Sequence, residues 1–300
     1  MPANDSAHSR HDIVAWLLWP GLLAGSLAIT GHGFRAGSPV LYFTLAYLLQ
    51  AVCLYALEQT RYHESAWNED DGQTFANVAH TLLNKGTAQI LIVFSSAIGI
   101  AAVITPMTEP GYGVWPRQWP MWLQVSLGLV AAEFGLYWAH RLAHEFPVLW
   151  RFHAIHHSVT RLWIVNTGRF HFIDSLLKIA AGLGVLLLLG APMEVIMWLS
   201  AITAFIGMLT HCNVRMRFGP LSWIFNTPEV HRWHHSRDLR EGNKNYGENL
   251  VVWDVLFGTY FNQPWRRPPV DIGIDEAVPR GFLDQLTWPF RRAGRRSASQ

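Results

Sequence analysis

Residues 137–158, YWAHRLAHEFPVLWRFHAIHHS, carry two tight clusters of histidines. His140 and His144 are four residues apart, and His153, His156 and His157 repeat spacings of three and four. Residues with these spacings share one face of an α-helix. The stretch therefore predicts helices that direct several imidazoles toward one point.

A third cluster, HRWHH, places His231, His234 and His235 on the same helical spacing. Neutral imidazole is a common metal ligand and suits Fe, Zn, Cu or Ni. Eight clustered histidines are too many for one ion, so we expect two metal ions. Histidines that serve only as surface or core residues are the alternative. That alternative would leave many imidazole nitrogens in need of partners in a half-apolar protein.

The composition is typical of a membrane protein. Half of the 300 residues are hydrophobic and 15% are charged, against about 25% charged in soluble domains. Fifteen tryptophans fit the membrane–water boundary, which indole rings favour. The net charge of +2 and the scattered basic residues argue against a nucleic-acid partner. Two cysteines exclude a disulfide framework.

Four apolar runs approach the roughly 20 residues that a membrane-spanning helix needs. They are residues 13–30, 40–57, 87–105 and 121–139. A fifth apolar stretch, 176–210, is broken by Gly190-Ala191-Pro192 and predicts a helical hairpin whose short first arm favours a re-entrant or interfacial position. We expect an all-α, polytopic membrane protein with about four transmembrane helices, the hairpin and a histidine-rich cap.

Arginines flank the later apolar runs, which places the cap and the dimetal centre on the cytoplasmic side. The expected organisation is residues 1–120 as N-terminal membrane helices and loops, and residues 121–263 as the catalytic domain. Residues 264–300 form a tail, and its last part, residues 291–300, is predicted to be disordered.

Four stretches carry a resemblance to a known family: YWAHRLAH (137–144), FHAIHHS (152–158), NTPEVHRWHHSRD (226–238) and NKNYGENLVVWDVLFGTY (243–260). The order and spacing of these four stretches resemble those of the fatty acid hydroxylase/sterol desaturase superfamily. Its bacterial sterol-desaturase-like and alkylglycerol-monooxygenase-like branch is the most similar. The resemblance covers roughly residues 125–263.

The resemblance implies a histidine-ligated, non-haem diiron oxidoreductase, in which zinc can occupy the site after purification. Such an enzyme uses O2 to hydroxylate or desaturate a C–H bond of a lipid, whether a sterol, a fatty acyl chain or an ether lipid. It also implies His211 and His171 as further ligands. For His211 a capping or ligand-orienting role is the alternative, and His171 fits the family pattern imperfectly, because Phe172 and Asp174 replace its proline and glutamate.

Three acidic residues are candidates to orient the ligand imidazoles without binding the metal themselves. Ligand imidazoles commonly donate their second N–H to a carboxylate, which makes Asp174 and Asp254 candidates. Glu133 is the one acidic residue of the run 121–139, where a charge is costly and usually functional. The resemblance also places an acidic residue before the first cluster.

The chain has no sequence signature of a fused cytochrome, flavin or ferredoxin domain. The electrons would therefore come from a separate electron-transfer protein or reductase. The expected location is the bacterial inner membrane. A membrane metal transporter or sensor that uses the same histidines is the alternative function, and a noncatalytic relative is a third. Transport favours ionisable residues near the middle of several spans, whereas these clusters lie beyond the end of one.

Overall fold

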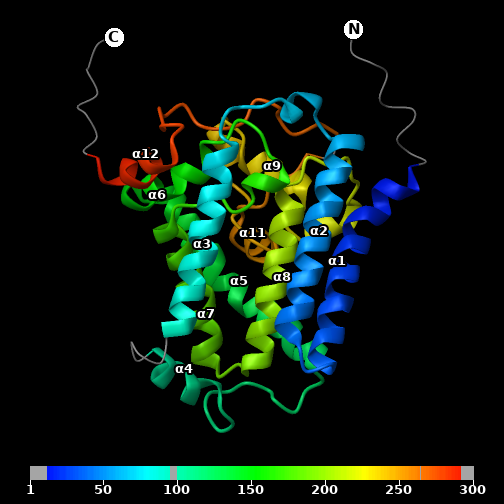
Figure 1. The fold of residues 1–300 in the computed structure, drawn as a ribbon, viewed down its shortest axis with the longest axis vertical. Helices are drawn as coiled ribbons and strands as arrows, with labels where there is room; N and C mark the ends of the chain where they lie inside the picture. The colour runs from blue at the N-terminus through cyan, green and yellow to red at the C-terminus, as the bar shows by residue number, and fades with distance from the viewer. Residues whose placement is uncertain (1–11, 95–99, 264, 292–300) are drawn as a thin grey trace.

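The computed structural model describes residues 12–94, 100–263 and 265–291, and its long helices run along one axis of the molecule (Figure 1). Within these residues the chain has helices and three isolated β-bridges but no strand, so the all-α prediction is confirmed. The two short helices that carry histidines of the second and third clusters lie toward one end, which we call the cap end.

The first helices are α1 (Ile13–Arg35), α2 (Pro39–Thr60), α3 (Thr74–Phe94) and α4 (Ile100–Thr108). The central ones are α5 (Met121–Glu145), α6 (Pro147–His157), α7 (Phe172–Leu189) and α8 (Met193–His211). Short helices complete the chain: α9 (Pro228–His234), α10 (Leu239–Gly242), α11 (Val252–Phe257) and α12 (Phe282–Thr287). Four 3-10 turns lie between them: η1 (Ser65–Asn68), η2 (Ile164–Asn166), η3 (Gly219–Trp223) and η4 (Trp288–Phe290).

Local sequence signals explain where these helices begin and end. The Asp12 side chain accepts a hydrogen bond from the backbone N–H of Ala15 and caps α1. Pro39, Pro147 and Pro228 stand in the first turns of α2, α6 and α9, where a missing N–H costs nothing. Gly190 ends α7 with a φ of 80°, and a Cβ there would meet the Tyr112 carbonyl oxygen at 2.2 Å.

Four helices of the described residues are long and apolar enough to cross a membrane, and they are α1, α2, α7 and α8. The expected number is therefore found, but two of the helices differ from the prediction. The predicted hairpin provides two of the candidates, and its first arm begins at Phe172 and is longer than predicted. Asp174 and Lys178 near its start are buried inside the protein and do not interrupt the helix.

The third and fourth predicted spans are not among these candidates. Residues 87–105 do not form one described span. Their first part belongs to α3, residues 95–99 lie outside the described part, and α4 follows. The run 121–139 lies in α5, a single helix whose Gln124 and Glu133 are buried. It packs along α7, and a Cβ on Gly135 would meet the Ala181 carbonyl oxygen at 2.2 Å, so these two helices approach closely only because this position is glycine.

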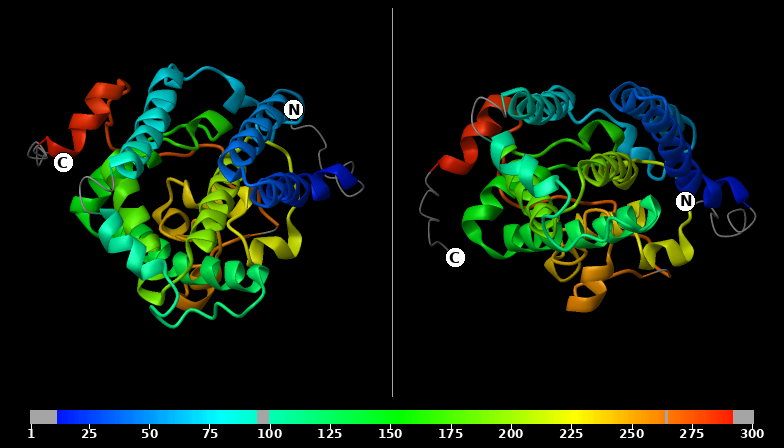
Figure 2. Two further views of the ribbon diagram at one scale, coloured as in Figure 1. Left: turned by 60° about the horizontal axis from the view of Figure 1, so that its bottom comes forward. Right: turned by 90° about the horizontal axis from the view of Figure 1, so that it is seen from below.

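One hydrophobic cluster joins the N-terminal helices to the later ones. It includes Trp19 on α1, Leu54 on α2 and Phe205 on α8, all nearly or fully buried. Seen end-on, α1 and α2 lie together on one flank, and α3 stands apart from α2 (Figure 2). The predicted domain boundaries remain a prediction, and residues 292–300 of the predicted disordered tail lie outside the described part.

Candidate metal centre

The histidine clusters converge into two groups at the cap end. The first group is His140, His144, His153, His157 and His234, and the second is His156, His211, His231 and His235. Within each group, one potential ligand atom per residue lies within 4.8 Å of the others. Each group could therefore hold a metal ion, and the two groups adjoin, since the rings of His157 and His235 are 4.5 Å apart.

Four elements supply these side chains. His140 and His144 end α5, whereas His153, His156 and His157 lie along one face of α6. His211 is the last residue of α8, and α9 with its C-cap carries the third cluster. The i, i+4 pairs share a group, as the spacing predicts, whereas His156 and His234 each join the other group from the rest of their cluster. Each group combines residues from three elements.

Hydrogen bonds behind the rings fix which nitrogen faces each group. Nδ1 of His140 contacts the Tyr246 carbonyl oxygen at 2.8 Å, and Nδ1 of His234 contacts the Lys244 carbonyl oxygen at 2.7 Å. In the second group, Nδ1 of His156 contacts the Arg169 carbonyl oxygen at 3.2 Å. A carbonyl oxygen only accepts, so each Nδ1 carries the proton and each Nε2 keeps its lone pair for a metal.

Asn166 fixes the ring of His211 in the same way. Its Nδ2 donates to the Arg161 carbonyl oxygen, so its Oδ1 faces Nδ1 of His211 at 3.1 Å. His144 has an equivalent contact, with Nδ1 at 3.1 Å from Oδ1 of Asn243. Neither asparagine was a candidate from the sequence, because an asparagine in a loop gives no signal of the ring behind it.

The ring nitrogens that point into the two groups suit metal binding better than they suit hydrogen bonds to one another. Nε2 of His140, His144 and His234 is buried without a hydrogen-bond partner in the described structure. Nε2 of His231 lies 2.9 Å from Nε2 of His211 and 3.2 Å from Nε2 of His235. Buried polar atoms are normally paired, so lone pairs that converge without donors suit a cation.

Burial also keeps these imidazoles in the state that binds metal. It lowers the pKa of His153, His156, His157, His231 and His235 well below the usual value. The same loss of solvation lowers the pKa of His234 to about 4. Ligand nitrogens must be unprotonated, so both groups are ready for a metal at neutral pH.

Asp174 is the predicted carboxylate that touches a histidine of the site. Its Oδ2 lies 3.1 Å from Nδ1 of His153, and Lys178, one turn further along α7, lies 4.0 Å from the same oxygen. Lys178 also pairs with Glu248 at 2.5 Å, and Glu248 approaches Nδ1 of His140 at 3.3 Å. Lys178 and Glu248 were missed, although a lysine inside an apolar run is a signal of function.

Glu133 and Asp254 support the site indirectly, through the loop that follows α10. Glu133 accepts hydrogen bonds from the backbone N–H groups of Glu248 and Asn249 and from the Asn249 side chain. Asp254 accepts from the backbone N–H groups of Tyr246 and Gly247, each at 2.8 Å. The two carboxylates therefore hold the loop whose carbonyl oxygens orient His140 and His234.

Nine of the ten predicted histidine ligands lie in the two groups, and His171 does not. His171 caps α7, because its Nδ1 accepts from the backbone N–H of Ile173, while its Nε2 contacts the Leu286 carbonyl oxygen. Both ring nitrogens are thus used away from the groups. The geometry favours His211 over His171 as an additional ligand.

Comparison with known proteins adds an independent result. A family model described as Fatty acid hydroxylase matches residues 125–259. The ornithine lipid hydroxylase OlsE of Rhizobium tropici is 54% identical over 293 residues, which cover 97% of this chain and 88% of that protein. Human alkylglycerol monooxygenase is 34% identical over 148 residues, which cover 49% of this chain and 32% of that protein. No solved structure matches significantly.

The chain belongs to the fatty acid hydroxylase family, as its motifs predict. A further relative, the fatty acid hydroxylase vlmA of Lecanicillium sp., is 33% identical over 174 residues, covering 51% of this chain and 47% of that protein. The protein is an oxygen-dependent hydroxylase with membrane helices and a histidine-rich metal site. The alternative of a metal transporter or sensor has no support among these matches.

Proposed function

We propose that the protein is a diiron hydroxylase of the bacterial inner membrane that acts on an ornithine lipid. Each histidine group would hold one iron ion, and zinc could replace iron after purification. The lipid hydroxylation of the family and the ornithine lipid named for the 54% identical relative support the choice of substrate.

The observation that carries this proposal is that two adjoining groups of histidines each contain enough imidazoles to bind a metal ion. Neither group lacks a ligand set, since five and four imidazoles converge in them. Imidazole suits iron as well as zinc. A noncatalytic relative would have no reason to keep both groups complete, together with the hydrogen bonds that fix their tautomers.

The chemistry balances with two electrons per turnover: a C–H bond, O2, two electrons and two protons yield a C–OH group and one water. Bound iron would supply the activation of O2. The protein's own residues hold the imidazoles in one tautomer and bury them, which excludes bulk water from the oxidising centre. The electrons would come from a separate protein or reductase.

The cap end is proposed to face the cytoplasm. Arg151, Arg161 and Arg169 lie on or next to α6 and η2, and Arg237 follows the third histidine cluster. Basic residues near the ends of spans favour the cytoplasmic side. From that side a soluble electron donor can reach the cap, while a lipid can reach it from the membrane.

The test is a lipid analysis of a strain that lacks the gene, complemented with wild-type protein or with His157→Ala. We expect a lipid with one additional hydroxyl group only in the wild-type complement. The result that would overturn the proposal is an unchanged ornithine lipid profile in all strains, with normal levels of inserted protein.

A further inference from the structure

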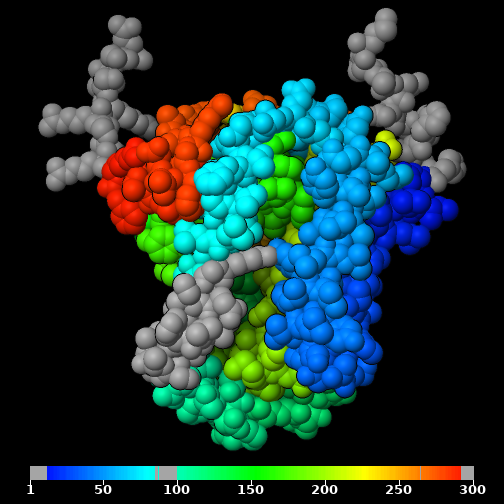
Figure 3. Space-filling model, viewed as in Figure 1, coloured from blue at the N-terminus to red at the C-terminus, as the bar shows by residue number. Residues whose placement is uncertain are grey.

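An apolar groove of about 380 Å³ opens between α2 and α3 and has η2 and α8 as its floor. The space-filling view shows the hollow between the two helices, with the segment around η2 visible at its back (Figure 3). Its rim is exposed and apolar: Val52 and Tyr55 on α2 are 66% and 51% exposed, and Leu82 on α3 is 65% exposed. Val52 and Tyr55 belong to a candidate membrane span, and an exposed apolar surface on such a helix suits contact with lipid.

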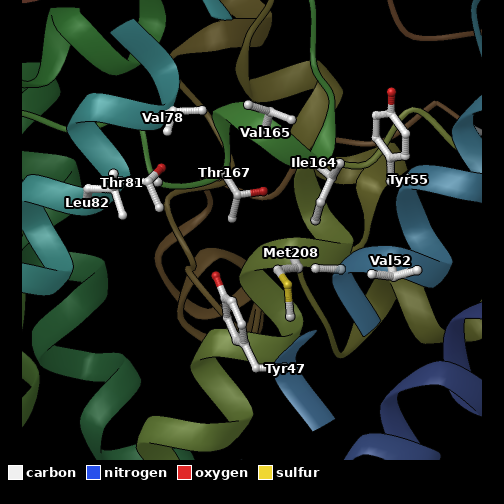
Figure 4. Close-up of a pocket in the computed structure, with 12 residues that line it drawn as sticks. Tyr47, Val52, Tyr55, Val78, Thr81, Leu82, Ile164, Val165, Thr167 and Met208 are labelled. Carbon is white, nitrogen blue, oxygen red and sulfur yellow. The ribbon is translucent and has the colours of Figure 1, made fainter. Parts of the chain in front are cut away.

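The floor of the groove is formed by residues that are close in the chain to those of the second histidine group. Met208 and Thr167 lie in the middle of the lining residues (Figure 4). Met208 precedes His211 by one turn of α8, and Thr167 follows Asn166, which holds the ring of His211. The floor therefore includes residues that are close in the chain to His211 and to the asparagine that orients it.

The floor segment also touches a second histidine of that group. The Phe170 ring stacks on the His156 ring at 4.1 Å, and the Arg169 carbonyl oxygen accepts from His156. Asn84 on α3 donates to the carbonyl oxygens of Gly168 and Phe170 and so ties the groove wall to this segment. An occupant that shifts the floor would act on His156 and His211 through these contacts.

The lining suits one hydrocarbon chain. It is almost wholly apolar, and its volume lies within the range of about 300–1,000 Å³ found for small-molecule sites. A second cavity, of about 340 Å³ between α5, α6 and α7, has Asp174 and Lys178 in its wall, which do not suit an alkyl chain. Among the residues that the structure describes, the buried Oγ1 of Thr167 has no hydrogen-bond partner, and it offers one polar contact at the floor.

The geometry points to the groove between α2 and α3 as the site where one chain of the substrate lipid enters from the membrane and lies against the metal centre. This inference rests on the proposed function for the identity of the substrate. Recognition of the chain itself needs only apolar contact, so it is independent of turnover and of the lipid head group.

Photolabelling tests the groove without turnover. Full-length protein in nanodiscs is irradiated with either of two probes, phosphatidylcholine or an ornithine lipid, each with a diazirine in one acyl chain. We expect label on Met208, which is 1% exposed, and on the half-buried Thr167, and not on the exposed rim alone. Label from either probe on these residues supports the groove, whereas label on neither of them overturns it.

A matched pair of variants on α2 completes the test. Ala51→Phe fills the groove from its wall and should abolish the label on Met208 and slow lipid hydroxylation. Ala56→Phe places the same ring on an exposed position of the same helix outside the groove and should leave both unchanged. Unchanged label in Ala51→Phe would contradict the inference. Label on the floor without any hydroxylation would instead contradict the proposed function and leave the groove intact.

Discussion

Oδ2 of Asp174 lies 3.1 Å from Nδ1 of His153, so a carboxylate in the first turn of α7 orients an imidazole on α6. Both side chains are buried, at 3% and 0% exposure. Such a contact fixes the tautomer of a ligand and raises its basicity. It links the membrane hairpin directly to the first histidine group.

Asp174→Leu should therefore lower metal affinity or turnover by about 10–100-fold, the usual effect of losing a residue that orients a ligand. Asp174→Asn keeps an accepting oxygen and should lose less. Metal content at limiting iron and the initial rate of lipid hydroxylation measure both effects. Asp275→Asn, whose side chain is 94% exposed, is the control. Equal activity of Asp174→Leu and this control would show that the contact with His153 has no role.

His157→Ala and His235→Ala remove one imidazole from each group. Each variant should insert in the membrane, lose turnover and bind less metal than wild type. Elemental analysis of purified protein, together with the hydroxylation assay, measures this. His32→Ala changes an exposed histidine on α1 and should behave as wild type. Wild-type turnover in either ligand variant would remove that group from the active site.

Glu133→Gln should destabilise the loop around Glu248. The carboxylate accepts three N–H donors, whereas a glutamine amide can present its own N–H₂ to one of them. Leaving a buried donor unpaired costs about 1–3 kcal/mol. We expect a lower unfolding temperature in detergent and slower turnover with most of the metal retained. If Glu133→Gln and Glu133→Leu both matched wild type, the carboxylate would have no part in holding the loop.

The buried His80 should make the folded protein less stable in mild acid. It is fully buried, and burial lowers its pKa from 6.5 to about 4. Between these two values the unfolded chain binds the proton and the folded chain does not, so stability falls as the pH drops from about 6.5 to about 4. The unfolding temperature of metal-loaded wild type and of His80→Gln would be compared at pH 7.5 and pH 5. A smaller drop in His80→Gln is expected, and an equal drop would contradict this assignment.

The histidine spacing predicted that the clustered imidazoles converge, because helical periodicity directs residues i, i+3 and i+4 to one face. The division into two groups could not be predicted, since it depends on how α5, α6, α8 and α9 meet. His153 joins one group and His156 the other, although they are three residues apart on α6. Likewise, the motif around His171 resembled a ligand motif, but the start of α7 uses that imidazole as its cap.

Apolar runs predicted the number of candidate spans and identified two of them, α1 and α2, but not the other two, α7 and α8. Polar residues at the start of α7 concealed its length, because sequence alone does not reveal that Lys178 pairs with Glu248 inside the protein. The role of Glu133 was predicted as support for a ligand. Its actual partners are backbone N–H groups more than 100 residues further along the chain, and no local pattern shows such contacts.

The most direct test of the account is hydroxylation by the purified, iron-loaded protein in nanodiscs that contain ornithine lipid. The assay supplies isotopically heavy O2, NAD(P)H and a ferredoxin with its reductase, and mass spectrometry follows the lipid. The account predicts a product that carries one heavy oxygen atom, and none in His157→Ala or His235→Ala. No product from protein with two bound iron ions per chain, or product oxygen that comes from water, would contradict it.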